Sequence, residues 1–208
     1  MAKKQELFDA IIKGDRKTTV QLIQAAVDNK EDLEEVLNDS MIAAMTEIGD
    51  QFTKNEIYVP DMLIAARAMQ AGLDIVEPIL TKQGHQPVGI VGIATVKGDL
   101  HDIGKNLVTI MLKGAGWQVM DLGVDYDVEK FQKAVDEGAQ AICCSALLTT
   151  TMDYMETVVE YFSDKEVKVY IGGAPITQAY ADQIGADGYA EDATGAVRVI
   201  SAGLGITA

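Results

Sequence analysis

The chain has 208 residues, of which 48% are hydrophobic and 24% charged, a balance typical of a globular protein with a buried core. Its net charge of −15 (17 basic against 32 acidic residues) argues against nucleic acid or an anionic membrane surface as a partner. No apolar run is long enough to span a bilayer, and no apolar stretch follows the lysines near the N-terminus. We therefore expect a cytoplasmic protein without a secretory signal.

The first part of the chain, residues 1–84, is predicted to be a helical domain. Its apolar side chains recur at helical spacing over residues 7–12, 20–27 and 33–52, and Pro60 opens a fourth helix at a position where proline is tolerated. Four helices with short connections predict a small four-helix bundle.

A polar, breaker-rich stretch at residues 82–87 predicts a linker, in which His85 is expected to be solvated. Beyond it, residues 85–208 repeat a strand–helix rhythm. Strands are expected at residues 88–95, 117–122, 141–145, 167–171 and 188–190, with helices at 104–114, 128–137, 152–163, 176–184 and 193–203. Such βα repeats predict a doubly wound α/β domain, a flavodoxin-like (Rossmann-type) five-stranded parallel sheet of order 2-1-3-4-5.

A histidine lies on the loop that leaves the first predicted strand, at the edge where open α/β sheets bind ligands. The loop reads Gly98-Asp99-Leu100-His101-Asp102-Ile103-Gly104, and its two glycines allow close backbone approach. Asp99 is placed to accept a hydrogen bond from one ring nitrogen of His101 and to leave the other free to bind a metal. By itself, the loop also fits an ordinary surface histidine.

Three further segments end strands at the same edge of the predicted sheet. The segment Ser145–Met152 carries four hydroxyl groups, which fit either a binding loop or simple helix capping. Gly172 and Gly173 are paired, which suggests that something passes close to the backbone, and Tyr189–Ala193 ends the fifth strand. The adjacent Cys143 and Cys144 are expected to be small buried core residues rather than a disulfide or zinc ligands.

Several common nucleotide sites are excluded by pattern. The G-x-G-x-x-G dinucleotide fingerprint does not follow the first strand, and the G-x-x-x-x-G-K-[ST] phosphate loop is absent. A flavin site of the flavodoxin type would need a phosphate-binding loop where this chain has His101 and acidic or bulky neighbours.

The motif D-x-H-x-x-G, then S-x-L, then G-G resembles the signature of cobalamin-binding domains. It is carried by Asp99, His101, Gly104, Ser145, Leu147, Gly172 and Gly173. The preceding bundle, with Phe52 and the stretch Tyr58–Leu63, is similar to the cap module of methionine synthase and of the free-standing corrinoid proteins of methyltransferase systems. The resemblance covers residues 5 to 203.

This resemblance implies cobalamin as the cofactor and assigns roles to individual residues. His101 would be the lower cobalt ligand, and Asp99 and Thr151 would continue from it as a hydrogen-bonded relay. The corrinoid and its nucleotide tail would contact Gly98, Asp99, Leu100, His101, Asp102, Gly104, Ser145, Leu147, Thr149, Gly172, Gly173 and Ala193. Phe52 and Val59 would cover the upper face of the corrin. One cap contact, a glutamate in methionine synthase, has no counterpart near Asn38 and is not carried over.

The function that the resemblance implies is a corrinoid methyl carrier of one-carbon metabolism, not catalytic alone. It would accept a methyl group on cobalt(I) from a substrate-specific methyltransferase and deliver it from methyl-cobalt(III) to a second methyltransferase acting on tetrahydrofolate or coenzyme M. A reductive activation protein is a further expected partner, and the cap would have to swing aside when a partner docks.

Two other functions are compatible with a cobalamin-binding domain. A cobalamin-responsive regulator would need a DNA-binding domain or a basic face, which this acidic chain lacks, and the cobalamin subunit of a radical mutase lacks the helical bundle. The methyl donor stays open among methanol, methylamines, betaines and methyl ethers, because donor choice would reside in the partner.

Overall fold

The computed structural model describes residues 2–206, with side chains from Gln5 onward. The chain divides into two compact units between Gln86 and Pro87, and the short turn Gly114–Gly116 is grouped with the first. Over the described residues, we find no helix with the length and apolar character needed to cross a membrane.

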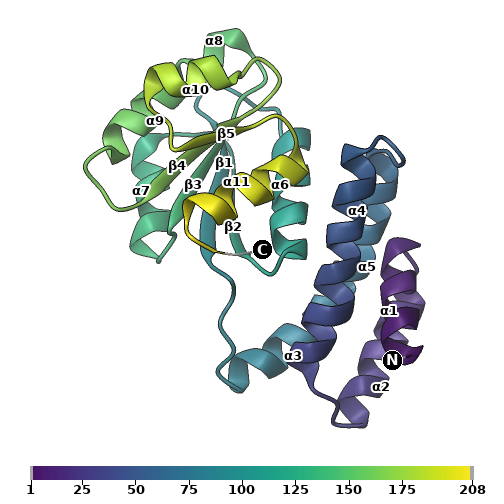
Figure 1. Cartoon of the computed structure of the whole chain (residues 1–208). Coiled ribbons are helices and arrows are strands. Elements are labelled where there is room, and N and C mark those ends of the chain that lie inside the picture. The colour runs from purple at the N-terminus through teal and green to yellow at the C-terminus, as the bar shows by residue number, and fades with distance from the viewer. Residues whose placement is uncertain (1, 207–208) are drawn as a thin grey trace. The chain divides into compact units, whose positions relative to one another are not determined.

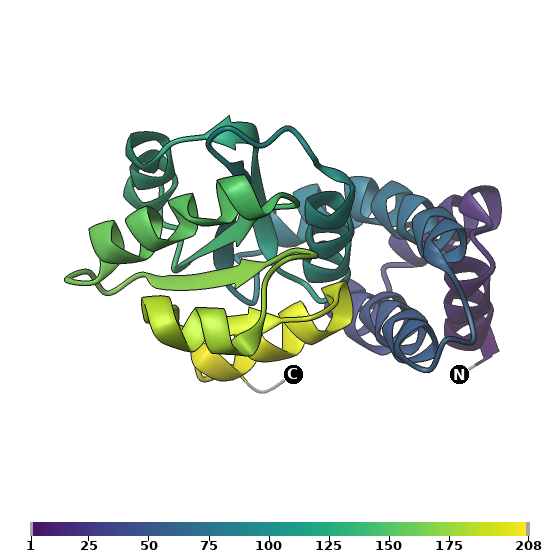
Figure 2. The ribbon, with the colours of Figure 1, turned by 90° about the horizontal axis from the view of Figure 1, so that it is seen from above.

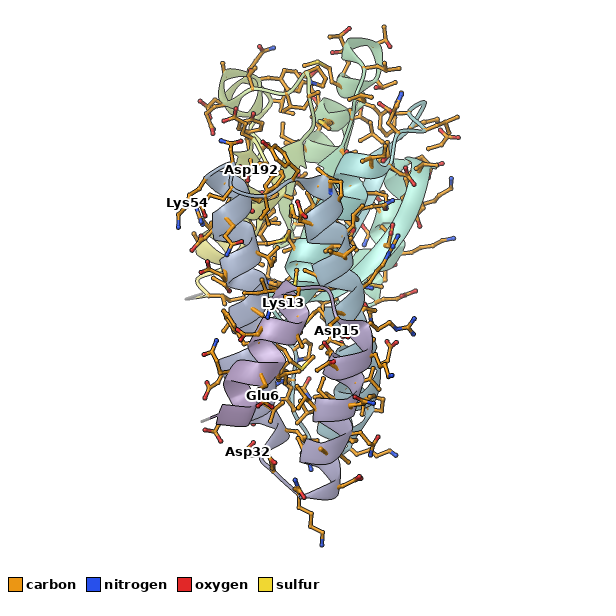
Figure 3. All side chains as sticks on the ribbon, turned by 90° about the vertical axis from the view of Figure 1, so that its right-hand side faces the viewer. Glu6, Lys13, Asp15, Asp32, Lys54 and Asp192 are labelled. Carbon is orange, nitrogen blue, oxygen red and sulfur yellow. The ribbon has the colours of Figure 1, made fainter. Side chains whose placement is uncertain are left out.

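The first unit is built from helices, as the apolar spacing predicts. Its segments are α1 (Ala2–Ile12), α2 (Arg16–Asp28), α3 (Leu33–Val36), the π-helical η1 (Leu37–Ile42), α4 (Ala43–Thr53) and α5 (Val59–Lys82) (Figure 1). The helix predicted over residues 33–52 is thus divided by a π-helical segment. Asp15 and Asp32 begin α2 and α3 by accepting backbone N–H groups of the first helical turn (Figure 3).

His85, which the sequence predicts to be solvated, is half-buried in this unit. Its Nδ1 atom lies 3.7 Å from a carboxylate oxygen of Glu34. The main chain turns back after α5, because the His85 amide donates to the carbonyl oxygen of Leu80.

The second unit contains the predicted parallel sheet. Its elements are β1 (Ile90–Val96), α6 (Ile103–Gly114), β2 (Gln118–Tyr126), α7 (Val128–Asp136), β3 (Ala141–Ser145), α8 (Thr149–Met152), α9 (Tyr154–Phe162), β4 (Lys168–Gly172), α10 (Gln178–Ile184), β5 (Gly188–Ala190) and α11 (Ala193–Gly203). Within residues 87–206, the five strands are all parallel in the order β2-β1-β3-β4-β5, which confirms the predicted topology.

Helices cover both faces of this sheet, with α7 and α9 on one side and α6 and α11 on the other (Figure 1). Alternate strand residues, such as Ile142 and Cys144 of β3, join Phe131 and Phe162 in a buried cluster on the α7–α9 side. The helices that flank the sheet are also seen from above in Figure 2. Cys143 and Cys144 are both buried and free, as predicted.

The edge strand β2 departs most from its prediction, since it runs to Tyr126 rather than ending at residue 122. Its register against β1 shifts twice, between Ile93 and Ala94 and again between Ala94 and Val96. Gly123 and Asp125 have φ values of 94° and 52° in this stretch, the left-handed geometry of bulged strands. The sequence pattern misses this extension because a glycine and an aspartate with positive φ usually mark a turn.

The carboxyl ends of the central strands lie side by side. Thr95 of β1 is in register with Ser145 of β3, Ser145 with Gly172 of β4, and Gly172 with Ala190 of β5. The loops that follow these strands therefore begin at the same edge of the sheet.

The paired glycines after β4 differ in what their backbone demands. Gly173 has a φ of 132°, and a Cβ atom there would overlap the carbonyl oxygen of Ala146, whereas a Cβ on Gly172 would meet only the Ala190 carbonyl oxygen at 3.4 Å.

We predict that Gly173→Ala lowers the free energy of unfolding by at least about 2 kcal/mol, while Gly172→Ala costs less than about 1 kcal/mol. Chemical denaturation of both variants checks this, and equal losses would contradict it.

Candidate functional site

His101 lies on the loop between β1 and α6, beyond the carboxyl end of β1. Its side chain is 51% exposed, so one edge of the ring is open to a ligand. The loop is anchored from β1 as well, because the buried Thr95 hydroxyl donates to the carbonyl oxygen of His101 at 2.7 Å. The histidine is thus exposed while its main chain is held.

The Asp99 carboxylate beneath His101 is fully buried and accepts hydrogen bonds from two loops. Its Oδ1 atom lies 2.7 Å from the His101 ring nitrogen Nδ1 and accepts the His101 amide at 3.0 Å. Its Oδ2 atom accepts the amide of Leu147 at 2.8 Å and the Thr151 hydroxyl at 2.7 Å. An anionic acceptor at Nδ1 favours the tautomer with its proton there, which leaves the Nε2 lone pair free.

The charge of Asp99 depends on these donors. Burial by itself raises the pKa of the carboxyl group. Hydrogen bonds from the amides of His101 and Leu147, and from the side chains of Thr151 and His101, lower the pKa by more than burial raises it. The net result is a pKa well below the ordinary value of 3.8. Asp99 therefore stays ionised throughout the neutral and mildly acidic range.

Exposed apolar side chains surround the histidine. Leu100 and Ile103, on either side of His101, are 72% and 73% exposed, and Leu147 and Leu148 on the facing loop are also exposed. Leu100 and Leu147 are among the residues predicted from the sequence, whereas Ile103 and Leu148 are not. The one sequence feature that marks Ile103 and Leu148 is that they are apolar residues in a polar loop facing the ligand. Large apolar side chains left in solvent beside a single imidazole indicate a surface that a flat, partly apolar ligand can cover.

The other predicted residues of this unit occupy three strand ends. Ser145 ends β3, Gly172 ends β4, Thr149 begins α8 and is exposed, and the buried Ala193 begins α11. The hydroxyl groups after β3 do not cap α8, whose N-cap residue is Leu148. The Thr151 hydroxyl instead bonds Asp99, so the capping interpretation does not account for it.

Of the four glycines in the predicted site, Gly98, Gly104 and Gly173 differ in their surroundings. A Cβ on Gly104 would meet nothing within 4 Å, and one on Gly98 would meet only the Thr151 Cγ2 at 3.6 Å. The close approach of Ala146 accounts for Gly173 without any ligand. Asp102, also predicted, is exposed and accepts the side-chain amide of Asn106 at 3.1 Å.

The predicted cap residues Phe52 and Val59 lie in the first unit, on either side of the turn that joins α4 to α5. Both side chains are half-buried. Val59 is the first residue of α5, whose start is held by the Asp61 carboxylate accepting the Tyr58 amide at 2.9 Å. One short connection with a capped end therefore separates the two residues along the chain.

Sequence reasoning missed an ion pair beside the histidine loop, between a buried lysine and an exposed aspartate. Lys105 of α6 is 2% exposed, and its ammonium group donates to Asp121 of β2 and to Asn106, both at 2.6 Å. A lysine three residues into a helix usually indicates an exposed face, so no signal in the sequence marks this one as buried.

No group of three or more His, Cys, Asp or Glu side chains among the described residues is arranged to hold a metal ion. The donor set at the loop is a single imidazole nitrogen. It suits a metal that arrives with most of its ligands already in place, as in a macrocycle.

Two families of B12 binding domain match the chain, one over residues 89–198 and the other over residues 4–77. The first match contains the whole histidine site, and the second covers most of the helical unit.

Curated relatives and solved structures point the same way. The chain is 40% identical to a corrinoid protein of Desulfitobacterium hafniense, covering 99% of each, and 40% identical to the dimethylamine corrinoid protein of Methanosarcina barkeri, covering 93% of each. Its fold is similar to a chain of the methanol:cobalamin methyltransferase complex of Methanosarcina barkeri, with a TM-score of 0.88 and 27% identity over 99% of this chain and 81% of that one. A cobalamin-binding protein of Desulfitobacterium hafniense gives a TM-score of 0.78 at 26% identity, covering 96% and 98%. The chain therefore belongs to the B12-binding family of corrinoid proteins, and cobalamin is its cofactor.

Proposed function

We propose that this protein is a methyl carrier that works between two separate methyltransferases. One, specific for the substrate, would load the cofactor, and the second would pass the methyl group to tetrahydrofolate or coenzyme M, with a reductive activation protein restoring the cofactor when it is oxidised. Named relatives from dimethylamine and methanol systems support a methyl donor of this small class.

The observation that carries the proposal is the buried Asp99 carboxylate bonded to Nδ1 of an exposed His101. This pairing leaves Nε2 as the one free nitrogen donor, at a surface lined by Leu100 and Leu147. The donor set fits a corrinoid, which needs one axial nitrogen from the protein and apolar contact beneath its ring. Gly98, Gly104 and Asp102 would lie along this contact, and Ser145, Thr149, Gly172, Gly173 and Ala193 would line the slot for the nucleotide tail.

Bound cobalamin supplies a cobalt centre that can take up and release a methyl group. The protein's part is to hold and orient it: His101 would supply the nitrogen that binds the cobalt, and Asp99 with Thr151 would hold the imidazole proton at Nδ1. Phe52 and Val59 would shield the upper, reactive side from water and give way to a partner.

The axial role of His101 is tested by its removal. We expect His101→Ala to bind cobalamin, because the apolar contacts and the tail slot remain, but to lose the absorption spectrum of histidine-ligated cobalt. His85→Ala is the matched control, since His85 is the other histidine of the two in the chain and lies in the helical unit. An unchanged spectrum in His101→Ala would refute the axial role.

The carrier role is tested by methyl transfer. The cofactor-loaded, reduced protein is offered methanol and each methylamine, with and without candidate methyltransferases, and the spectrum of the methylated cofactor is followed. We expect methylation only when a donor and its own methyltransferase are both present. Methylation by the carrier and donor alone, or by no pair at all, would contradict the proposal.

The hydrogen bond from Thr151 to Asp99 should contribute stability in a pH-dependent way. We expect Thr151→Val to lower the free energy of unfolding by about 1.5 to 3 kcal/mol at pH 7, as for hydrogen bonds to a charged group. Because folding lowers the pKa of Asp99 below 3.8, the stabilisation is complete above that value and is lost as the pH falls below it. The unfolded state is common to variant and wild type, so their difference should persist at about pH 4 and shrink only at lower pH, where the Asp99 carboxylate of the folded variant takes up a proton.

The matched control for this measurement is Thr150→Val, one residue earlier on the same exposed turn. Its loss should be small and independent of pH. A Thr151→Val loss at pH 7 no larger than that of Thr150→Val would show that the Thr151 bond to the ionised Asp99 does not stabilise the fold.

A further inference from the structure

The edge strand β2 reaches the histidine loop through one residue, Asp125. The Asp125 amide donates to the carbonyl oxygen of Asp99 at 3.0 Å, and its carboxylate Oδ1 accepts the amide of Gly98 at 2.8 Å. These two bonds hold the main chain of Gly98 and of Asp99, the residue whose side chain bonds the His101 ring.

The backbone at this point explains why β2 is bulged. Two register shifts against β1 leave Asp125 in the bulge between Gly123 and Tyr126, the partners of Ala94 and Val96, and Asp125 adopts a φ of 52° there. At Gly123 the same strand meets a positive φ with glycine, the residue that tolerates it best. The second position with a positive φ is occupied not by glycine but by Asp125, whose carboxylate oxygen accepts the amide of Gly98.

The remaining anchors of the loop act elsewhere. Leu147 and Thr151 hold the Asp99 side chain, and Thr95 holds the His101 carbonyl oxygen. Among the hydrogen bonds made by described residues outside the loop and β1, those from Asp125 fix the main chain at Gly98 and Asp99. Without them, the main chain of Asp99 would be held only through its amide, which donates to the Val96 carbonyl oxygen at 3.1 Å.

We infer that Asp125 is a positioning residue for the His101–Asp99 pair: it fixes the backbone of Asp99 and thereby the direction in which His101 presents Nε2. This inference rests on the proposed role of His101 as the cobalt ligand. Asp125 does not itself touch the ring of His101.

Two substitutions separate the carboxylate oxygen from the backbone geometry. Asp125→Gly keeps the positive φ but removes the acceptor, whereas Asp125→Asn keeps both an acceptor oxygen and a residue that tolerates this φ. Lys30→Gly is the matched control, because Lys30 also has a positive φ, 55°, but lies between α2 and α3. It reports the effect of placing glycine at a left-handed position away from the site.

The first measurement uses the protein without cofactor. In Asp125→Gly we expect the amide of Gly98 to exchange its hydrogen about five to ten times faster, the effect of losing one hydrogen bond to a carboxylate. The nitrogen NMR signals of the His101 ring should also move toward a mixture of tautomers. Asp125→Asn should stay near wild type in both, and Lys30→Gly should leave both unchanged.

The second measurement uses the cobalamin-loaded protein. In Asp125→Gly the ratio of histidine-ligated to histidine-free cofactor, read from the absorption spectrum, should fall about five- to tenfold, with rescue in Asp125→Asn. If Asp125→Gly changes only the melting temperature, with Gly98 exchange and the ligation ratio as in wild type, Asp125 is purely structural and the inference is overturned.

The two failures can be told apart. If wild-type protein binds cobalamin without any histidine-ligated spectrum, the proposed role of His101 fails and the inference fails with it. If wild type shows that spectrum and Asp125→Gly shows it undiminished, the role of His101 stands and only the inference about Asp125 is wrong.

Discussion

The buried Asp99 carboxylate is the interaction on which the rest of the site depends. A lone carboxylate at this depth would be protonated or would destabilise the fold, because burial removes it from water. Here five donors surround it: the amides of His101, Leu147 and Leu148, the Thr151 hydroxyl and the His101 ring. The same bonds that keep the carboxylate ionised therefore join the loop after β1 to the loop after β3 and set the tautomer of the histidine.

The surrounding structure serves to keep those two loops in place. The parallel register brings Thr95, Ser145 and Gly172 to one edge of the sheet, so the loops begin as neighbours. Gly173 lets the chain after β4 pass against Ala146 without a side chain between them. On the other side of β1, the Lys105–Asp121 pair ties the first turn of α6 to the edge strand β2.

These contacts show what the protein itself contributes to the site. The chain offers one exposed imidazole, an ionised partner for it and apolar side chains such as Leu100 and Ile103 that remain exposed. Nothing in this set selects a methyl donor, which agrees with a carrier whose specificity lies in its partners. The similar proteins include one named for dimethylamine and one from a methanol complex, so the same kind of chain is found with different methyl donors in its name.

The order of the strands, their parallel direction and the positions of Asp99, His101 and Ser145 at the sheet edge could be predicted from the sequence, because hydrophobic period and breaker residues are local signals. Three features could not. The extension of β2 through Gly123 and Asp125, the burial of Lys105 and the true reason for Gly173 each depend on a partner distant in the chain: the Gly98–Asp99 backbone, Asp121 and Ala146. By itself the sequence determined that a histidine follows the first strand, at the edge of the sheet where ligands bind. The tertiary structure decided how that side chain is held, because only folding brings the two loops and the edge strand to one carboxylate.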